Sequence, residues 1–191
     1  MSLTQTQFIK KPFGAYYQRD PGKEDEFLTH VGPGTPCGEY LRRFWQPVAY
    51  AHELTDLPLR RRIMGEDLVV FRDGRGEVGL LQLHCCHRGT SLEYARIEER
   101  GIRCCYHGWL FDVDGTILDT PLEPSDSNLK DRFYQGAYPV KELGGLIWSY
   151  MGPPEQMPDM WALDLLHIPG YELQCGEVHG GPNVKECNWL Q

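Results

Sequence analysis

Four cysteines and three histidines lie within residues 84–107 of this 191-residue chain, and both side-chain types bind metals. They include two closely spaced pairs, Cys85-x-His87 and Cys104-x-x-His107, each at the end of a short apolar segment. Two cysteines and two histidines can hold a [2Fe-2S] cluster, with both thiolates on one iron and both imidazoles on the other. The glycine that follows each pair would let the loop backbone approach the inorganic sulfides and donate hydrogen bonds to them.

A structural zinc site is the first alternative, because zinc also accepts two cysteines and two histidines. Zinc fingers usually place like donors together, as C-x2–4-C and H-x3–5-H, whereas here each segment supplies one thiol and one imidazole. The second alternative is that the cysteines are small buried side chains with no ligand. That interpretation suits Cys37, Cys175 and Cys187, which we leave unassigned, but it does not explain so many donors in one short stretch.

Composition argues against several classes of partner. Nucleic acid and anionic membranes favour basic surfaces, whereas this chain has a net charge of −8, which we interpret as a source of solubility. No apolar run approaches the roughly eighteen residues of a membrane span, and the N-terminus shows no secretory signal. Seven cysteines form an odd number, which favours reduced thiols and metal ligands over disulfides. We therefore expect a cytoplasmic protein.

The segments that would position these donors are short and mostly extended. A helix is predicted to begin at Pro36 with Thr35 as its N-cap. Its apolar face would be formed by side chains at three- and four-residue spacing, namely Cys37, Tyr40, Leu41 and Phe44. Beyond residue 46 the apolar residues alternate with period two, which predicts strands at 47–51, 61–64, 67–71, 78–83, 102–103, 110–113, 116–118, 137–140 and 146–150.

Turn signals separate these strands. Tight turns are predicted at Gly65-Glu66, Asp73-Gly74 and Asp114-Gly115, and Gly144-Gly145 would join strand 137–140 to strand 146–150. Many short strands at close spacing predict a mainly β fold, an antiparallel barrel or sandwich with a small cluster-binding subdomain and a short N-terminal helix.

Three regions follow from these patterns. Residues 1–33 are polar and rich in turn formers, and are predicted to be an arm that orders only against another surface. Residues 34–154 would form the metal-binding domain. Residues 155–191 would be a connector, with an amphipathic piece at 160–166 and the opening strand of a further domain at 184–191.

The two metal-binding motifs resemble those of a known family. Cys-x-His-Arg-Gly at residues 85–89, followed by Cys-x-Tyr-His-Gly-Trp at 104–109, is similar to the Rieske centre of aromatic-ring-hydroxylating oxygenases. Residues 35–48 resemble the opening of the Rieske domain in alpha subunits of the phthalate, phenoxybenzoate and vanillate type. Residues 185–191 resemble the first strand of the catalytic domain that follows it. The resemblance extends over nearly all of residues 30–191.

The resemblance implies a Rieske-type [2Fe-2S] cluster with four protein ligands, which are Cys85 and Cys104 on one iron and His87 and His107 on the other. Cys86 and Cys105 would then be neighbours of the ligands, and His84 a histidine at a strand end. Respiratory-chain Rieske proteins carry a further cysteine in each loop and a serine after His-Gly. Here Thr90, Tyr106 and Trp109 occupy those positions. Fewer hydrogen bonds to the sulfurs imply a potential at the low end of the Rieske range, roughly −150 mV.

The resemblance also implies a function. In the family a flavin or iron–sulfur reductase, or a ferredoxin, loads the cluster, which passes electrons to a mononuclear Fe(II) in the catalytic domain of a neighbouring subunit of a trimer. That iron is held by two histidines and a carboxylate, which would lie beyond Gln191, since His167 and His179 have no close-set partner. We therefore expect the electron-transfer part of a truncated ring-hydroxylating or O-demethylating oxygenase subunit. The alternatives are a self-standing Rieske ferredoxin and a zinc-stabilised binding module.

Overall fold

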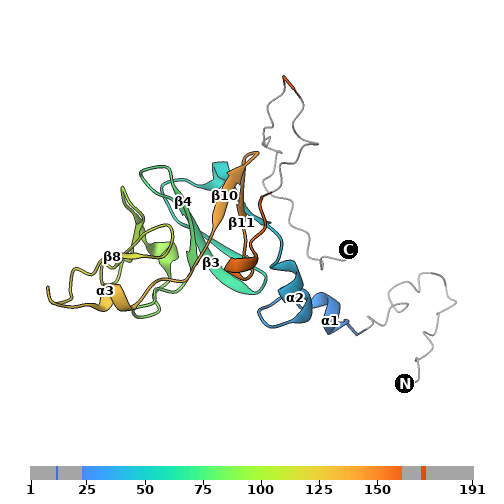
Figure 1. Ribbon diagram of the computed structural model, residues 1–191, viewed down its shortest axis with the longest axis horizontal. Coiled ribbons are helices and arrows are strands. Elements are labelled where there is room, and N and C mark those ends of the chain that lie inside the picture. The colour runs from blue at the N-terminus through green and yellow to red at the C-terminus, as the bar shows by residue number, and fades with distance from the viewer. Residues whose placement is uncertain (1–11, 13–22, 161–168, 171–191) are drawn as a thin grey trace.

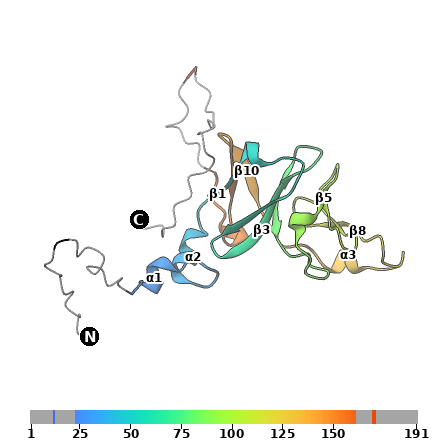
Figure 2. The same cartoon turned by 180° about the vertical axis from the view of Figure 1, so that it is seen from behind.

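Three antiparallel sheets, of three, four and four strands, form the framework of the described part of the chain. The computed structural model describes residues 12, 23–160 and 169–170. Figures 1 and 2 show two of the sheets at the centre, helices α1 and α2 at one end, and the third sheet with α3 at the other. The predicted mainly β, antiparallel fold is confirmed.

The middle layer of the molecule is a four-stranded sheet whose two central strands are buried on both faces. Its strands, in spatial order, are β2 (Leu59–Ile63), β3 (Glu66–Arg72), β4 (Val78–Gln82) and β9 (Ala137–Tyr138). Successive side chains of a strand point to opposite faces. Leu68 and Val70 of β3 therefore pack on one side, and Val69 and Phe71 on the other, and all four are fully buried.

Each face of this sheet packs against a different partner. One face meets the three-stranded sheet of β1 (Gln46–Tyr50), β11 (Leu146–Ser149) and β10 (Val140–Leu143), and its core includes Val48 and Ile147. The opposite face meets the residues from His84 to Gln135, which we call the cluster-binding subdomain. That subdomain carries β5 (Arg96–Ile97), β6 (Ile102–Arg103), β7 (Leu110–Phe111), β8 (Ile117–Asp119) and α3 (Leu129–Arg132).

The helices before the first sheet are short and locally capped. In α2 (Pro36–Leu41) the Thr35 hydroxyl accepts a hydrogen bond from the Gly38 N–H at 3.2 Å, as predicted. The predicted apolar face is right for Cys37, which is buried, and Leu41, which is half-buried. It is wrong for Tyr40, which is exposed, and for Phe44, which is exposed and lies beyond the end of the helix. Helix α1 (Glu26–Thr29) lies within the segment predicted to be an arm. The remaining helical turns are of the 3-10 type, at Ala51–Glu53, Leu92–Tyr94 and Pro154–Gln156.

Two predicted connections differ from the structure. The β2–β3 turn consists of Met64 and Gly65, at φ 44° and 80°, and Glu66 already begins β3. A two-residue hairpin turn of this hand needs positive φ at both central residues, so the turn lies one residue earlier than predicted. The predicted strand 137–140 is divided at Pro139, because β9 pairs with β4 while β10 pairs with β11. Proline lacks the N–H that a continuous ladder would need.

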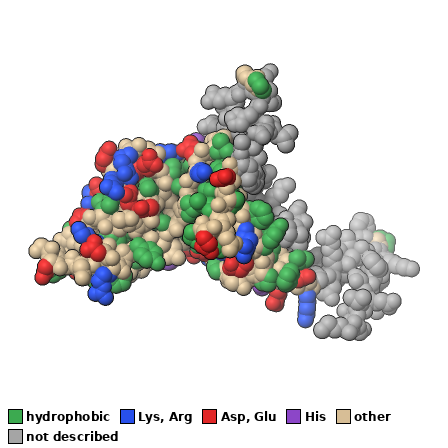
Figure 3. Space-filling model, in the orientation of Figure 1, with side chains coloured by type: hydrophobic (Ala, Val, Ile, Leu, Met, Phe, Trp, Pro, Cys, Tyr) green, Lys and Arg blue, Asp and Glu red, His purple; other side chains and the backbone are tan. Residues whose placement is uncertain are grey.

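Charged side chains of both signs are intermixed over the cluster-binding subdomain, as Figure 3 shows. They include the ion pairs of Arg103 with Glu98 and Asp119, both at 2.9 Å. On the face seen in Figure 3 the negative charge is therefore not gathered into one acidic patch. Within the described residues no helix has the length and apolar character needed to span a bilayer. The amphipathic piece predicted at 160–166 and the strand predicted at 184–191 lie outside the described residues, save for residue 160.

Candidate metal centre

Two loops of the same hydrogen-bonded shape carry the predicted ligands. In the first cluster loop, residues 85–90, the Cys85 N–H donates to the Thr90 carbonyl at 2.9 Å and the Gly89 N–H donates to the Cys85 carbonyl at 2.8 Å. The second cluster loop, residues 104–109, repeats both bonds in the same order, at 2.9 and 3.1 Å. Gly89 has a φ of 73° and Gly108 a φ of 75°, which L side chains rarely adopt. The structure thus gives these glycines a conformational role in ending each loop.

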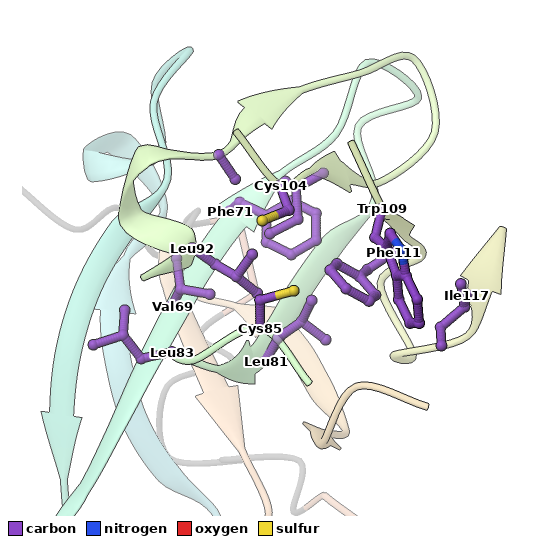
Figure 4. Close-up of a cluster of buried hydrophobic side chains, with 12 residues drawn as sticks. Val69, Phe71, Leu81, Leu83, Cys85, Leu92, Cys104, Trp109, Phe111 and Ile117 are labelled. Carbon is purple, nitrogen blue, oxygen red and sulfur yellow. The ribbon is translucent and has the colours of Figure 1, made fainter. Parts of the chain in front are cut away.

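The two cysteine thiols that the sequence singled out lie against each other in the protein interior. Cys85 and Cys104 are each 4% exposed, and Figure 4 shows both sulfur atoms among the apolar side chains between Leu92 and Trp109. A hydrogen bond from the Cys85 thiol lowers the pKa of Cys104 to about 6, and the N–H groups of Tyr106 and His107 at its sulfur act in the same direction. The same bond, with burial, raises the pKa of Cys85. Within the pair, Cys104 is therefore the thiol that ionises first.

The two imidazoles form a second pair, nearer the surface. The rings of His87 and His107 lie 4.7 Å apart between centroids, and both residues are half-buried. His87 stacks on Trp109 at 4.5 Å with an interplanar angle of 3°, and Tyr106 covers His107 at 3.8 Å. Burial lowers the pKa of His87, and the nearby charges of His107 and Arg88 lower it further. A neutral imidazole is the form that binds a metal.

The donor set is sorted by type, which fits a dinuclear cluster. Among the described residues no three Cys, His, Asp or Glu side chains converge on the position of a single ion. A tetrahedral zinc site would need all four donors around one point. A Rieske cluster needs a thiol pair for one iron and an imidazole pair for the other. The buried thiols and the half-exposed imidazoles fit that requirement.

The other cysteines and His84 have different surroundings. Cys86 and Cys105 are exposed, whereas Cys37 is buried in α2. His84 is exposed at the end of the strand, where its Nδ1 lies 3.1 Å from the Gly89 carbonyl oxygen and its backbone pairs with Ser91. Cys175 and Cys187 lie outside the described residues.

Sequence reasoning missed two side chains that brace the cluster loops. Arg103 donates through Nη1 to the Gly108 carbonyl at 2.7 Å, and so ties the second loop to the strand before it. Gln135, which is 1% exposed, accepts from the Cys86 N–H at 2.8 Å. The position of Arg103 beside a ligand could have suggested its role. No sequence signal marked Gln135, because its partners lie 49 or more residues away.

Comparison with known proteins agrees with this geometry. The family model described as "Rieske [2Fe-2S] domain" matches residues 44–139, which is half of the chain. The chain belongs to the Rieske [2Fe-2S] domain family. The Rieske domain therefore carries a [2Fe-2S] cluster, and the predicted family and cofactor are confirmed.

The relatives of this Rieske domain are oxygenase subunits. The chain is 53% identical to the tert-butanol monooxygenase / tert-amyl alcohol desaturase oxygenase subunit of Aquincola tertiaricarbonis, over 86% of the chain and 34% of the relative. It is 50% identical to phenoxybenzoate dioxygenase subunit alpha of Ectopseudomonas oleovorans, over 93% and 46%. The structure of dicamba monooxygenase with non-heme iron and dicamba superposes with a TM-score of 0.58 at 28% identity, over 63% of this chain and 36% of that one. The chain thus spans a third to a half of these relatives' length.

Proposed function

We propose that this Rieske domain is the electron-transfer domain of a ring-hydroxylating or O-demethylating oxygenase subunit, with Cys85, His87, Cys104 and His107 as the cluster ligands. The observation that carries this proposal is that the four donors form two separate pairs, the two thiols buried in the interior and the two imidazoles nearer the surface. When bound, the cluster takes up and releases one electron at a time. The similarity to two oxygenase subunits supports the class of reaction.

The two cysteines and the two histidines have different roles: the cysteines hold the cluster in the interior, and the histidines place it near the surface. Cys85 and Cys104 are in the apolar core, which keeps water from the sulfur side. His87 and His107 stand at the edge, where an electron can leave toward a partner over a short distance. Stacking of His87 on Trp109 holds the first imidazole in one orientation.

The partners we propose follow from this one-electron role. A flavin or iron–sulfur reductase, or a ferredoxin, would supply the electron, and a mononuclear Fe(II) would accept it. That iron would belong to the catalytic domain of a neighbouring subunit in a trimer. The relatives are named as oxygenase subunits, which supports a system of several components. The protein would work in the cytoplasm, because the thiols must stay reduced to bind iron.

We further propose that the Rieske domain occupies residues 34–154, between an N-terminal arm at 1–33 and a connector that begins at 155. Hydrogen bonds fasten the first residues of the connector to the start of this region. Trp45 donates through Nε1 to the Pro158 carbonyl at 3.0 Å, and Arg43 donates to the side chain of Gln156. The chain therefore enters and leaves the domain at one place.

The ligand assignment is tested by iron and acid-labile sulfide analysis, with the absorption spectrum of the purified protein. Cys104→Ser and His107→Ala should lose the visible absorption and most of the iron. Cys105→Ser is the matched control, since this exposed thiol lies beside a ligand, and it should keep the cluster. Loss of the cluster in Cys105→Ser alone would show that the ligand register is wrong by one residue. Zinc in place of iron in the wild-type protein would overturn the function.

A further inference from the structure

The guanidinium of Arg103 is held by three hydrogen-bonded partners within the cluster-binding subdomain. Its Nη1 donates to the Gly108 carbonyl at 2.7 Å and to Asp119 of β8 at 2.9 Å. Its Nε donates at 2.9 Å to Glu98, which directly follows β5. A guanidinium is planar, so partners at two of its nitrogens fix the plane in which it lies. The two carboxylates therefore hold the group in the orientation that reaches the second cluster loop.

Gly108 lies between the second imidazole ligand and Trp109, and its own surroundings leave it little freedom. Its N–H donates to the Cys104 carbonyl at 3.1 Å, and its carbonyl accepts from Arg103, so both backbone polar groups have partners. A Cβ at Gly108 would lie 2.9 Å from Cγ of Pro121, so the proline ring lies directly against this glycine. The backbone that follows the second ligand is thus held by contacts with three other residues.

Trp109 links the same stretch of backbone to the other cluster loop. Its indole stacks on His87 with 4.5 Å between the ring centroids and an interplanar angle of 3°. The side chain of Trp109 is buried, so the indole has little room to turn. The peptide group whose carbonyl Arg103 binds joins Gly108 to Trp109. It lies next to His107 on one side and next to the residue that stacks on His87 on the other.

We propose that Arg103 is a positioning residue that sets the orientation of both imidazole ligands, of His107 through Gly108 and of His87 through Trp109. The proposal rests on the ligand set given above and goes beyond it, because Arg103 lies outside that set. Groups that orient a ligand from behind contribute to a metal site together with the ligand itself. Without the guanidinium, the Gly108 carbonyl would turn to water, and the second cluster loop would move with it.

Two measurements on Arg103→Met test this role, because methionine keeps an unbranched apolar stem and removes every donor. Hydrogen exchange of the peptide at residues 104–109 should accelerate about tenfold or more, since a hydrogen bond from a charged donor is lost. Pulsed EPR of the reduced protein, labelled with nitrogen-15 at histidine, should show altered couplings for both histidine nitrogens. Arg103→Lys keeps one charged donor but not the planar fork, so it should show the same changes at smaller size.

Arg96→Met is the matched control for the loss of a cation. Arg96 donates to the same carboxylate of Glu98, from Nε at 3.1 Å, and within the described residues it has no hydrogen bond to either cluster loop. Its removal should leave both the exchange of residues 104–109 and the histidine couplings unchanged.

Unaltered couplings in Arg103→Met would overturn the proposal even if exchange accelerates, because Arg103 would then hold the loop without orienting the imidazoles. Equal changes in Arg96→Met would overturn it as well, since the loss of any nearby cation would then suffice. If Arg103→Met does not fold, Arg103→Lys decides, and wild-type exchange and couplings in that variant would contradict the role. A wild-type protein without a cluster would instead refute the proposed function.

Discussion

The carboxylate of Asp73 joins the middle sheet to the cluster-binding subdomain, and we predict that Asp73→Ala destabilises the protein strongly. Its Oδ1 accepts from the N–H groups of Arg75 at 3.0 Å and Glu77 at 3.1 Å, in the turn between β3 and β4. Its Oδ2 accepts from the Arg75 guanidinium at 2.8 and 3.0 Å, and from the Gly101 N–H of the subdomain at 3.0 Å. The side chain is 0% exposed.

The magnitude follows from which donors can turn to water after the substitution. The Gly101 N–H is buried and would lose its acceptor, which costs about 1–3 kcal/mol. The two N–H groups of the turn add about 1 kcal/mol together, because both are partly exposed. The Arg75 guanidinium is 36% exposed and can be hydrated. We therefore expect the free energy of unfolding to fall by about 3 kcal/mol.

Equilibrium urea unfolding under anaerobic, reducing conditions, followed by far-UV circular dichroism, measures this change. With an m-value of about 2 kcal/mol per molar urea, the midpoint should fall by about 1.5 M. Asp114→Ala is the matched control: its exposed carboxylate sits in a hairpin turn and, within the described part of the chain, accepts from the Thr116 N–H alone, at 2.9 Å. That variant should lose about 0.5 kcal/mol. Equal midpoints for the two variants would refute the role given to Asp73.

Two further predictions concern the same junction. Gly101→Ala should lower the melting temperature by far more than Gly76→Ala, although both glycines have positive φ. A Cβ at Gly101 would lie 1.9 Å from the Phe111 carbonyl oxygen, whereas none of the described atoms lies within 4 Å of a Cβ at Gly76. Equal melting temperatures would contradict this packing. Stability should also fall in acid. Burial is the largest single influence on Asp112 and opposes its ionisation, but the hydrogen bonds from Arg100, the Val113 N–H and Arg75 together outweigh burial and leave the pKa of Asp112 lowered. A carboxylate whose pKa is lower in the folded state stabilises the fold above its unfolded pKa of about 4, and the stabilisation is lost as the pH falls further. Unfolding midpoints that do not change between pH 6 and pH 3 would contradict this assignment.

Local sequence patterns predicted most of the strands, but not the layers that they form. The apolar run in β3 (Leu68–Phe71) marked a strand, and its continuity is explained by burial on both faces. Which face meets the cluster-binding subdomain depends on partners far along the chain. The same holds at Pro139, where neighbouring residues pair with different sheets. The β2–β3 turn was placed one residue late because Met64 takes a positive φ that glycine signals alone do not reveal.

The candidate site was more accessible to sequence reasoning than its supports were. The spacing of the two Cys/His pairs marked the site, the resemblance to the Rieske motifs singled out the thiols of Cys85 and Cys104, and the structure places them at the start of two loops of the same shape. The roles of Gln135 and Arg103 were not predicted, because each role consists of hydrogen bonds from the side chain to backbone groups of a cluster loop. Those groups are known only once the chain is folded.

The split of donors between the two irons is the central claim, and pulsed EPR of the reduced protein labelled with nitrogen-15 at histidine tests it most directly. Nuclei bound to the paramagnetic cluster couple strongly to its electron spin, so the spectrum counts the coordinated imidazoles. Two strongly coupled histidine nitrogens are predicted, one from His87 and one from His107. A cluster with no strongly coupled histidine nitrogen would mean that sulfur ligates both irons, and would contradict the account.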